Sequence, residues 1–169
     1  LYTSSSYYED RANCYIEMED YTNALKDLDK AIELSPDDAV YYNNRADFYR
    51  HYMKQKDKAL LDYAKAISVS TSDYSTSRAL NNRALIYKDN GDYELAIKEL
   101  TKAIEINPGK DLYYNNRGES YQAIQDYDNA ITDYTKAIEL NPSSSYYNDR
   151  AYCYIEMEDY TNALKDLDK

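Results

Sequence analysis

The chain has 169 residues and a formal net charge of −11 at pH 7, and 30% of its residues are charged. A surface of this sign repels phosphate backbones, which proteins bind with lysine and arginine, so we expect no nucleic-acid partner. No apolar run approaches the roughly 18 residues that a membrane helix needs, and no basic-then-apolar leader opens the chain. These features favour a cytoplasmic protein without a membrane partner.

Self-similarity with a period of about 34 residues divides the chain into five units. In the first unit, residues 5–38, apolar and small residues recur at steps of three, four and seven, which is the period of a helix. Asp20 marks a turn between two helices, where a carboxylate can cap the second helix, and Pro36 ends that helix. Each unit is therefore predicted to be a pair of helices.

The second unit, residues 39–72, has one extra residue near the segment KQKDK and lacks the terminal proline. Three residues are inserted in the stretch 68–77 that follows, which is rich in serine and threonine. We expect an irregular junction there, which is either a tolerated loop or a bend that marks a contact site.

The third, fourth and fifth units, residues 77–110, 111–143 and 144–169, repeat the plan of the first, and the fifth stops within its second helix. An aspartate again stands at the turn of each unit. These expected caps are Asp92, Asp126 and Asp159, and the prolines that end the third and fourth units are Pro108 and Pro142.

Alanine and glycine recur in columns that let two helices approach closely, while tyrosine, leucine and isoleucine columns fill the space between them. Beside one small column stands an arginine in every unit, and an acid recurs in every second helix. The arginines are Arg11, Arg45, Arg83, Arg117 and Arg150, and the acids are Asp27, Asp62, Glu99, Asp133 and Asp166. We expect a partly buried ion pair within each unit, because an unpaired guanidinium beside packed helices is costly. The alternative is a row of arginines that reads an anionic ligand.

The fourth unit, DLYYNNRGESYQAIQDYDNAITDYTKAIELNP, resembles the tetratricopeptide repeat family. The matching residues are Tyr114, Gly118, Tyr121, Ala130, Tyr134, Ala137 and Pro142. Arg117 departs from the pattern, because the family usually has an apolar residue there. The resemblance extends over essentially the whole chain. It implies an all-α, right-handed superhelical solenoid of antiparallel helix pairs whose first helices line a concave groove. It also implies a non-catalytic scaffold that binds a peptide or protein segment in that groove.

The first and last units are almost identical: residues 6–30 and 145–169 differ only where Glu9 corresponds to Asn148 and Asn13 to Tyr152. The two positions are four residues apart and so share one helix face, which on the tetratricopeptide pattern looks into the groove. Either the framework was held while a ligand-facing surface varied, or a recent duplication has had time for two tolerated changes.

The same face carries asparagines through the middle of the chain. An amide both donates and accepts, so a row of amides can bind an extended peptide backbone with little demand on its side chains. This resembles the asparagine ladder of long tetratricopeptide arrays, with Asn44, Asn82 and Asn116 as the matching residues. Biased composition on a solvated face is the alternative. The residues predicted to line the groove are Glu9, Asn13, Asn43, Asn44, Asp47, Arg50, His51, Arg78, Asn81, Asn82, Lys88, Asn115, Asn116, Glu119, Asn148 and Tyr152.

Chaperone-binding members of the family clamp a C-terminal carboxylate, and Asn13, Asn44 and Arg78 fall on clamp positions. Glu9 and Asn82 replace two of the clamp cations. A glutamate repels a carboxylate, so we expect no acidic chaperone tail to bind there.

Catalytic and metal-binding patterns are absent from the sequence. His51 is the only histidine and has no neighbour at metal-ligand spacing, and the three glycines form no phosphate loop. Cys14 and Cys153 occupy equivalent, distant positions, so two reduced thiols are expected. We therefore expect no enzyme activity, no cofactor and no metal. The alternatives to a peptide-binding scaffold are a structural spacer or self-assembling rod with an idle groove, and client-recruiting repeats of a larger enzyme.

We expect the sequence to be cut within a unit at both ends. Leu1–Thr3 aligns with Leu140–Pro142, the end of a second helix, and Lys169 stops before the second helix of the fifth unit is complete. Leu164 and Leu167 would then lack a following helix, so we expect head-to-tail self-association at high concentration.

Overall fold

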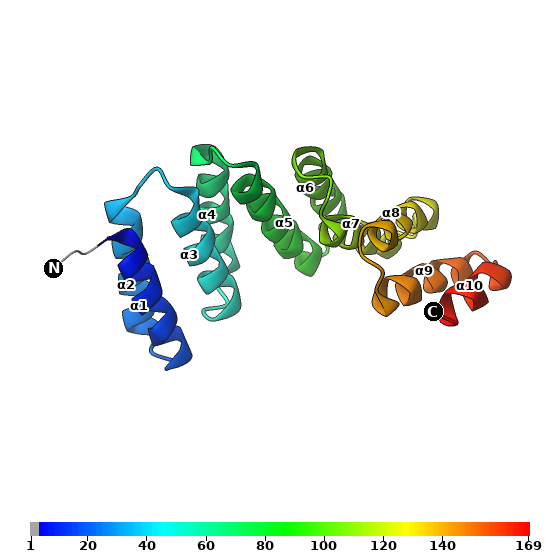
Figure 1. Cartoon of the computed structure of the whole chain (residues 1–169), viewed down its shortest axis with the longest axis horizontal. Helices are drawn as coiled ribbons and strands as arrows, with labels where there is room; N and C mark the ends of the chain where they lie inside the picture. Colours follow the sequence, from blue (N-terminus) through cyan, green and yellow to red (C-terminus); the bar gives the residue numbers. More distant parts are fainter. Residues whose placement is uncertain (1–3) are drawn as a thin grey trace. The chain divides into compact units, whose positions relative to one another are not determined.

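The computed structural model describes residues 4–169, so the expected helix end at Leu1–Thr3 lies outside the described residues. Within this range all regular secondary structure is helical (Figure 1). The chain forms two compact units, one ending at Asn82 and the other covering Arg83–Lys169, and the division falls inside helix α5.

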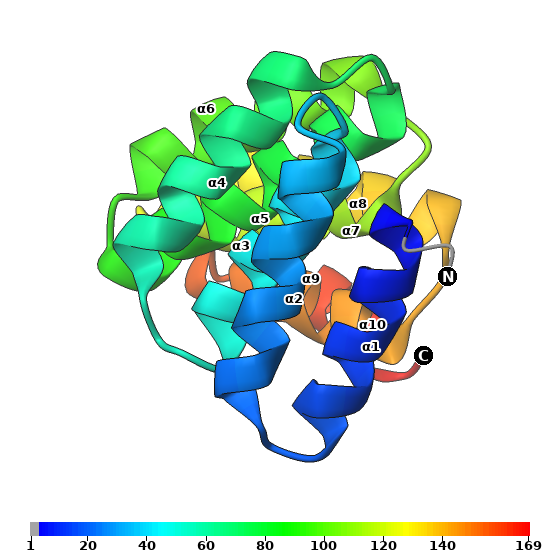
Figure 2. The ribbon, with the colours of Figure 1, turned by 90° about the vertical axis from the view of Figure 1, so that its left-hand side faces the viewer.

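The first compact unit contains α1 (Ser5–Glu17), α2 (Tyr21–Leu34), α3 (Ala39–His51), α4 (Lys56–Val69) and the beginning of α5 (Asp73–Asn90). Helices α1 and α2 pack together, as do α3 and α4, and α2 also packs on α3. Figure 2 shows α1 and α2 joined by a short turn and running antiparallel. The predicted helix pairs are therefore present in this unit.

The second compact unit contains the end of α5, followed by α6 (Tyr93–Ile106), α7 (Asp111–Ala123), α8 (Tyr127–Leu140), α9 (Ser144–Glu156) and α10 (Tyr160–Leu167). Helices α7 and α8 form one pair and α9 and α10 another, while α6 packs on α7 and α8 on α9. The predicted all-α solenoid of helix pairs is confirmed.

The helix ends follow the predicted punctuation with one exception. Asp20, Asp126 and Asp159 each accept a hydrogen bond from the backbone N–H three residues later, at 3.1, 3.4 and 3.1 Å. Asp92 occupies the same N-cap position of α6, but its side chain makes no capping hydrogen bond, so the predicted cap is wrong there. Helices α2, α6 and α8 end two residues before a proline, as expected.

The junction at 68–77 is mostly helical, which corrects the expectation of an irregular loop. Helix α4 continues to Val69 and α5 begins at Asp73, so only residues 70–72 are outside a helix. The Oγ atom of Ser70 accepts a hydrogen bond from the backbone N–H of Ser72 at 3.2 Å, and Thr76 Oγ1 donates to the carbonyl of Ser72 at 2.9 Å. Hydroxyls close to the chain favour such local bonds, and here they start a helix instead of replacing one.

Alanine columns form the centre of each helix pair and are completely buried, as Ala46 and Ala130 show. The ring of Tyr134 is fully buried and lies over Gly118 in α7. A Cβ atom at Gly118 would stand 2.9 Å from Cε1 of Tyr134, a distance that real side chains do not adopt. An alanine at position 118 would therefore require the ring of Tyr134 to shift.

The five predicted ion pairs are all formed. The arginine Nε or Nη2 lies 2.6–2.8 Å from an acid oxygen in four of them, and Arg83 makes the equivalent contact with Glu99. Most of these arginines also contact the preceding unit: Arg117 donates to Thr101 Oγ1 at 3.0 Å and Arg150 to Thr135 Oγ1 at 2.8 Å. Tyrosine rings flank the guanidinium of Arg117 at 5.9 and 6.0 Å. The arginine column therefore joins helices, and the alternative of an anion-reading row is not supported.

Several large apolar side chains of the last helix face solvent: Leu164 is 63% exposed and Leu167 53%. Among the described residues, no helix is long and apolar enough to cross a membrane.

Candidate functional site

The first-helix surface is the polar face that the first helices of the repeats present. In the first compact unit it includes Glu9 and Asn13 on α1, Asn44 and Asp47 on α3, and Arg78 on α5. The amide of Asn44 donates to the carboxylate of Glu9, and Arg78 Nη2 donates to Asn44 Oδ1 at 2.8 Å. One amide thereby links three successive first helices.

Asp47 is the centre of a second group of bonds on this surface. Its carboxylate pairs with Arg78 and accepts a hydrogen bond from Asn82 Nδ2 at 2.9 Å and another from the hydroxyl of Tyr63. Burial and the Asp47 charge raise the pKa of the Tyr63 phenol, so the hydroxyl remains a donor. The structure thus brings together Asn44, Asp47, Arg78 and Asn82, which the sequence predicted as neighbours in one groove.

Four of the predicted ladder residues are buried. Asn43 is completely buried and donates from Nδ2 to the carbonyl oxygen of Ser75 at 3.1 Å, and Asn81 donates to Asn82 Oδ1 at 2.9 Å. Asn115 donates to Glu119 Oε1 at 2.8 Å, and Asn116 is 5% exposed. These four side chains lie at contacts within the protein, so the structure does not place them where a ligand would reach them. The double ladder is reduced to half-buried Asn44 and Asn82.

A cavity of about 260 Å³ opens on the first-helix surface between α1 and α3. Its walls combine apolar side chains, two amides and two carboxylates. The lining residues are Asn13, Ile16, Glu17, Asn44, Asp47, Phe48 and Tyr52. Ile16, Glu17, Phe48 and Tyr52 were not among the predicted groove residues.

Arg50 and His51 stand near the end of α3, with Arg50 half-buried and His51 exposed. Neither lines the α1–α3 cavity.

In the second compact unit, Lys88 on α5 pairs with Glu119 on α7. Burial and the Glu119 carboxylate raise the pKa of Asp149 on α9, while Lys88 lowers it. Asn148 and Tyr152, the two positions at which the last unit departs from the first, are exposed on α9. This surface therefore carries its own charged cluster beside the variable positions.

Models of the tetratricopeptide repeat match residues 6–38, 77–110 and 112–144, and also 39–73 and 144–169. These matches extend over nearly the whole sequence. The chain belongs to the tetratricopeptide repeat family. Membership supports a role as a protein–protein interaction scaffold, since repeats of this kind serve as binding surfaces.

Curated relatives share only part of the tetratricopeptide chain. Serine/threonine-protein phosphatase 5 from Homo sapiens is 37% identical over 100 residues, which are 58% of this chain and 19% of the phosphatase. The match therefore leaves most of the enzyme without a counterpart in this sequence.

Two solved structures show the same tetratricopeptide fold at low sequence identity. MamA superposes with a TM-score of 0.83 at 18% identity, covering 99% of this chain and 93% of its own. YrrB, described as a TPR protein with an unusual peptide-binding site, has a TM-score of 0.74 at 20% identity and covers 95% of this chain and 81% of its own. At these identities the likeness shows the fold alone.

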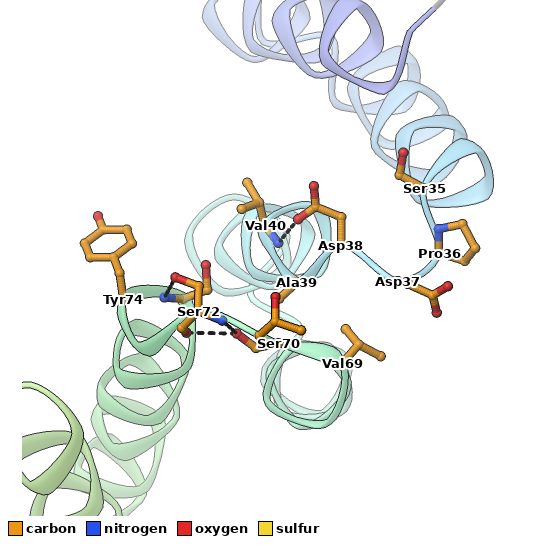
Figure 3. A pocket seen from close by; sticks show the side chains of 12 residues that line it. Ser35, Pro36, Asp37, Asp38, Ala39, Val40, Val69, Ser70, Ser72 and Tyr74 are labelled. Carbon is orange, nitrogen blue, oxygen red and sulfur yellow. Dashed lines mark hydrogen bonds between the residues drawn. The ribbon is translucent and has the colours of Figure 1, made fainter.

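A second, larger hollow of about 690 Å³ lies between the segment that joins α2 to α3 and the segment that joins α4 to α5 (Figure 3). The sequence did not predict this hollow. Asp38 lines it and caps α3 by accepting from the backbone N–H of Val40 at 2.9 Å, while Ser70 accepts from Ser72. Several of its polar groups thus form the local bonds that start helices. The inserted serine and threonine residues were the only signal for this feature.

Proposed function

We propose that this tetratricopeptide array is a non-catalytic scaffold that binds an extended peptide segment along the first-helix surface. Asn44 is the main backbone contact, assisted by Asn82. Asn44 still has one N–H and one oxygen lone pair beyond the bonds already described, so it can bind a peptide group without breaking the network, and Asn82 retains one oxygen lone pair. Arg50, His51 and Arg78 set selectivity on the first compact unit, and Lys88, Glu119 and Tyr152 set it on the second.

The observation that carries the proposal is the position of the two differences between the first and last units. Asn13 lines the α1–α3 cavity, and Glu9 accepts the hydrogen bond from Asn44 beside it. Residues that pack one helix on another are identical in the two copies, including Ala12 and Ala151, which are completely buried. Change confined to the edge of a cavity favours a surface that was varied for its ligand.

The test exchanges this surface without changing the framework. The double variant Glu9→Asn/Asn13→Tyr gives the first unit the residues of the last, a combination that the chain already folds. Peptides are first selected with the unaltered chain from a random 12-residue library displayed on phage. We expect the double variant to change their affinities by about tenfold or more, since hydrogen bonds and a cavity wall are altered.

Glu33→Asn is the matched control, because it removes one negative charge from an exposed side chain on the second helix α2. Circular dichroism should show equal helicity for both variants. Equal affinities of the unaltered and the double-variant chains would contradict the proposal, and failure to select any peptide would favour a structural spacer with an idle groove.

A second candidate function is that these repeats recruit clients to a catalytic domain of a longer protein. The match to a serine/threonine-protein phosphatase favours it, because tetratricopeptide repeats and an enzyme occur there in one chain. The reading frame of the parent gene tests it: a catalytic domain in the same polypeptide would support this role, and a parent made of repeats alone would contradict it.

Head-to-tail self-association is a further part of the proposal. The exposed Leu164 and Leu167 on α10 and the 45% exposed Tyr7 on α1 are apolar surfaces that a neighbouring repeat would cover. Sedimentation over a hundredfold range of concentration should show a rising mass, and a constant monomer mass would contradict this part.

A further inference from the structure

We propose that the cavity between α1 and α3 receives the side chain of a lysine or arginine of the bound segment. This inference rests on the proposed function and adds the chemical class of one ligand residue.

The walls of the cavity fit the long stem of a basic side chain. Ile16 and Tyr52 supply accessible apolar surface, whereas Phe48 also lines the cavity but is only 1% exposed and offers a ligand little area. The rings of Phe48 and Tyr52 lie 5.7 Å apart with 31° between their planes, and the Tyr52 side chain is 44% exposed. Lysine and arginine bury their methylene groups against such surfaces while the charged end stays near water, and an aromatic face attracts that end.

The polar groups of the cavity fit a cation. Glu17 and Asp47 contribute carboxylates, and none of the described residues that line the cavity carries a positive charge. Arg78 already pairs with Asp47, which leaves the exposed carboxylate of Glu17 as the uncompensated charge at the cavity edge. The amide oxygen of Asn13 is an additional acceptor for N–H donors.

The field around the cavity is negative. Glu9, which is hydrogen-bonded to Asn44 in the cavity wall, adds a third carboxylate to those of Glu17 and Asp47, and Arg78 pairs with Asp47 alone among these three. Burial and the neighbouring Asp10 raise the pKa of Glu9, while Arg78 lowers it only as a smaller influence. A cation entering here gains from this field, whereas an acidic side chain is repelled.

The experiment selects peptides from a random 12-residue phage library with the full chain and sequences the enriched pool. We expect lysine or arginine to be enriched at one position of the aligned binders. Replacing that residue by norleucine in a synthetic peptide keeps the stem and removes the charge, and it should weaken binding by about tenfold. The loss should shrink as salt is raised, because partly exposed charges are screened.

Glu17→Gln tests the site itself and should reduce the preference for the basic residue over norleucine by about fivefold. Glu156→Gln is the matched control, since Glu156 occupies the same local sequence, YIEMEDY, in the last unit. Both side chains are exposed, so neither change should affect folding. The control should retain the full preference.

The possible failures can be told apart. Enriched peptides without a basic position, or a preference that Glu17→Gln leaves intact, would overturn this inference while the scaffold function stands. Selection of no peptide at all would overturn both.

Discussion

The substitution Gly118→Ala tests the packing of the fourth repeat. In an ordinary helix this change stabilises by about 1 kcal/mol, because glycine loses more backbone freedom on folding than alanine. Here the new methyl group would meet three ring atoms of Tyr134 at 2.9, 3.1 and 3.2 Å. The ring is completely buried and its hydroxyl donates to Gln122 Oε1 at 2.7 Å, so it has little room to withdraw.

Forcing a methyl group into a packed site costs about 1–3 kcal/mol, so the net effect of Gly118→Ala is a loss of about 1 kcal/mol in unfolding free energy. Urea unfolding followed by circular dichroism at 222 nm measures it. The double variant Gly118→Ala/Tyr134→Leu introduces the two residues that stand, both buried, at the equivalent positions of the third repeat, Ala84 and Leu100. Its destabilisation should be smaller than the sum of the two single changes by about 1–2 kcal/mol.

The chain itself contains the arrangement that would refute this reasoning. In the second repeat, Ala46 and Tyr63 occupy the equivalent positions and are both buried, with the Tyr63 hydroxyl donating to Asp47. If the ring of Tyr134 can move to the equivalent position, Gly118→Ala will stabilise the protein and the double variant will show no coupling.

Two other predictions concern buried groups of the second compact unit. Asp133→Ala leaves the guanidinium of Arg117 without its paired acid and should lower the unfolding free energy by about 3 kcal/mol. Asp128→Ala, on the exposed side of the same helix, should change the unfolding free energy by less than about 0.5 kcal/mol. Equal effects of the two variants in urea unfolding would contradict a structural role for the ion pair. The Cys153 thiol is completely buried, and burial raises its pKa to about 11. At pH 8 it should therefore react with Ellman's reagent only after denaturation, while the exposed Cys14 thiol should react at once. Equal reaction rates of the two thiols in the native protein would contradict the burial of Cys153.

The ion pairs could be predicted from the sequence because both partners recur in every unit and lie in the same helix pair. Arg117 and Asp133 are 16 residues apart, and the geometry of one repeat decides whether they meet. Because this geometry repeats with the period of the sequence, the spacing of the two residues was enough to predict the ion pair.

The asparagines could be assigned to one helix face but their accessibility could not be predicted. Whether Asn43 faces a ligand or the next helix depends on how closely successive first helices approach, which is set by packing between repeats. The amide of Asn43 bonds to the backbone at Ser75, in the segment where the inserted residues had suggested a loop. Helix α5 begins directly after Ser72, and its first turn supplies the Ser75 carbonyl oxygen to which the buried amide of Asn43 donates.

The near identity of the first and last units has a consequence for folding. During refolding, α1 can dock against the helices that normally contact α9. The ion pairs do not discriminate against this error, because Arg11 and Arg150 each pair with an aspartate. Only contacts that do not recur can discriminate between these registers. The hydrogen bond from Asn44 to Glu9 is such a contact, since docking α9 in place of α1 would bring Asn148 to that amide. A contact that occurs in only one repeat therefore favours the correct alignment of the array and disfavours misfolded forms in which repeats have exchanged places.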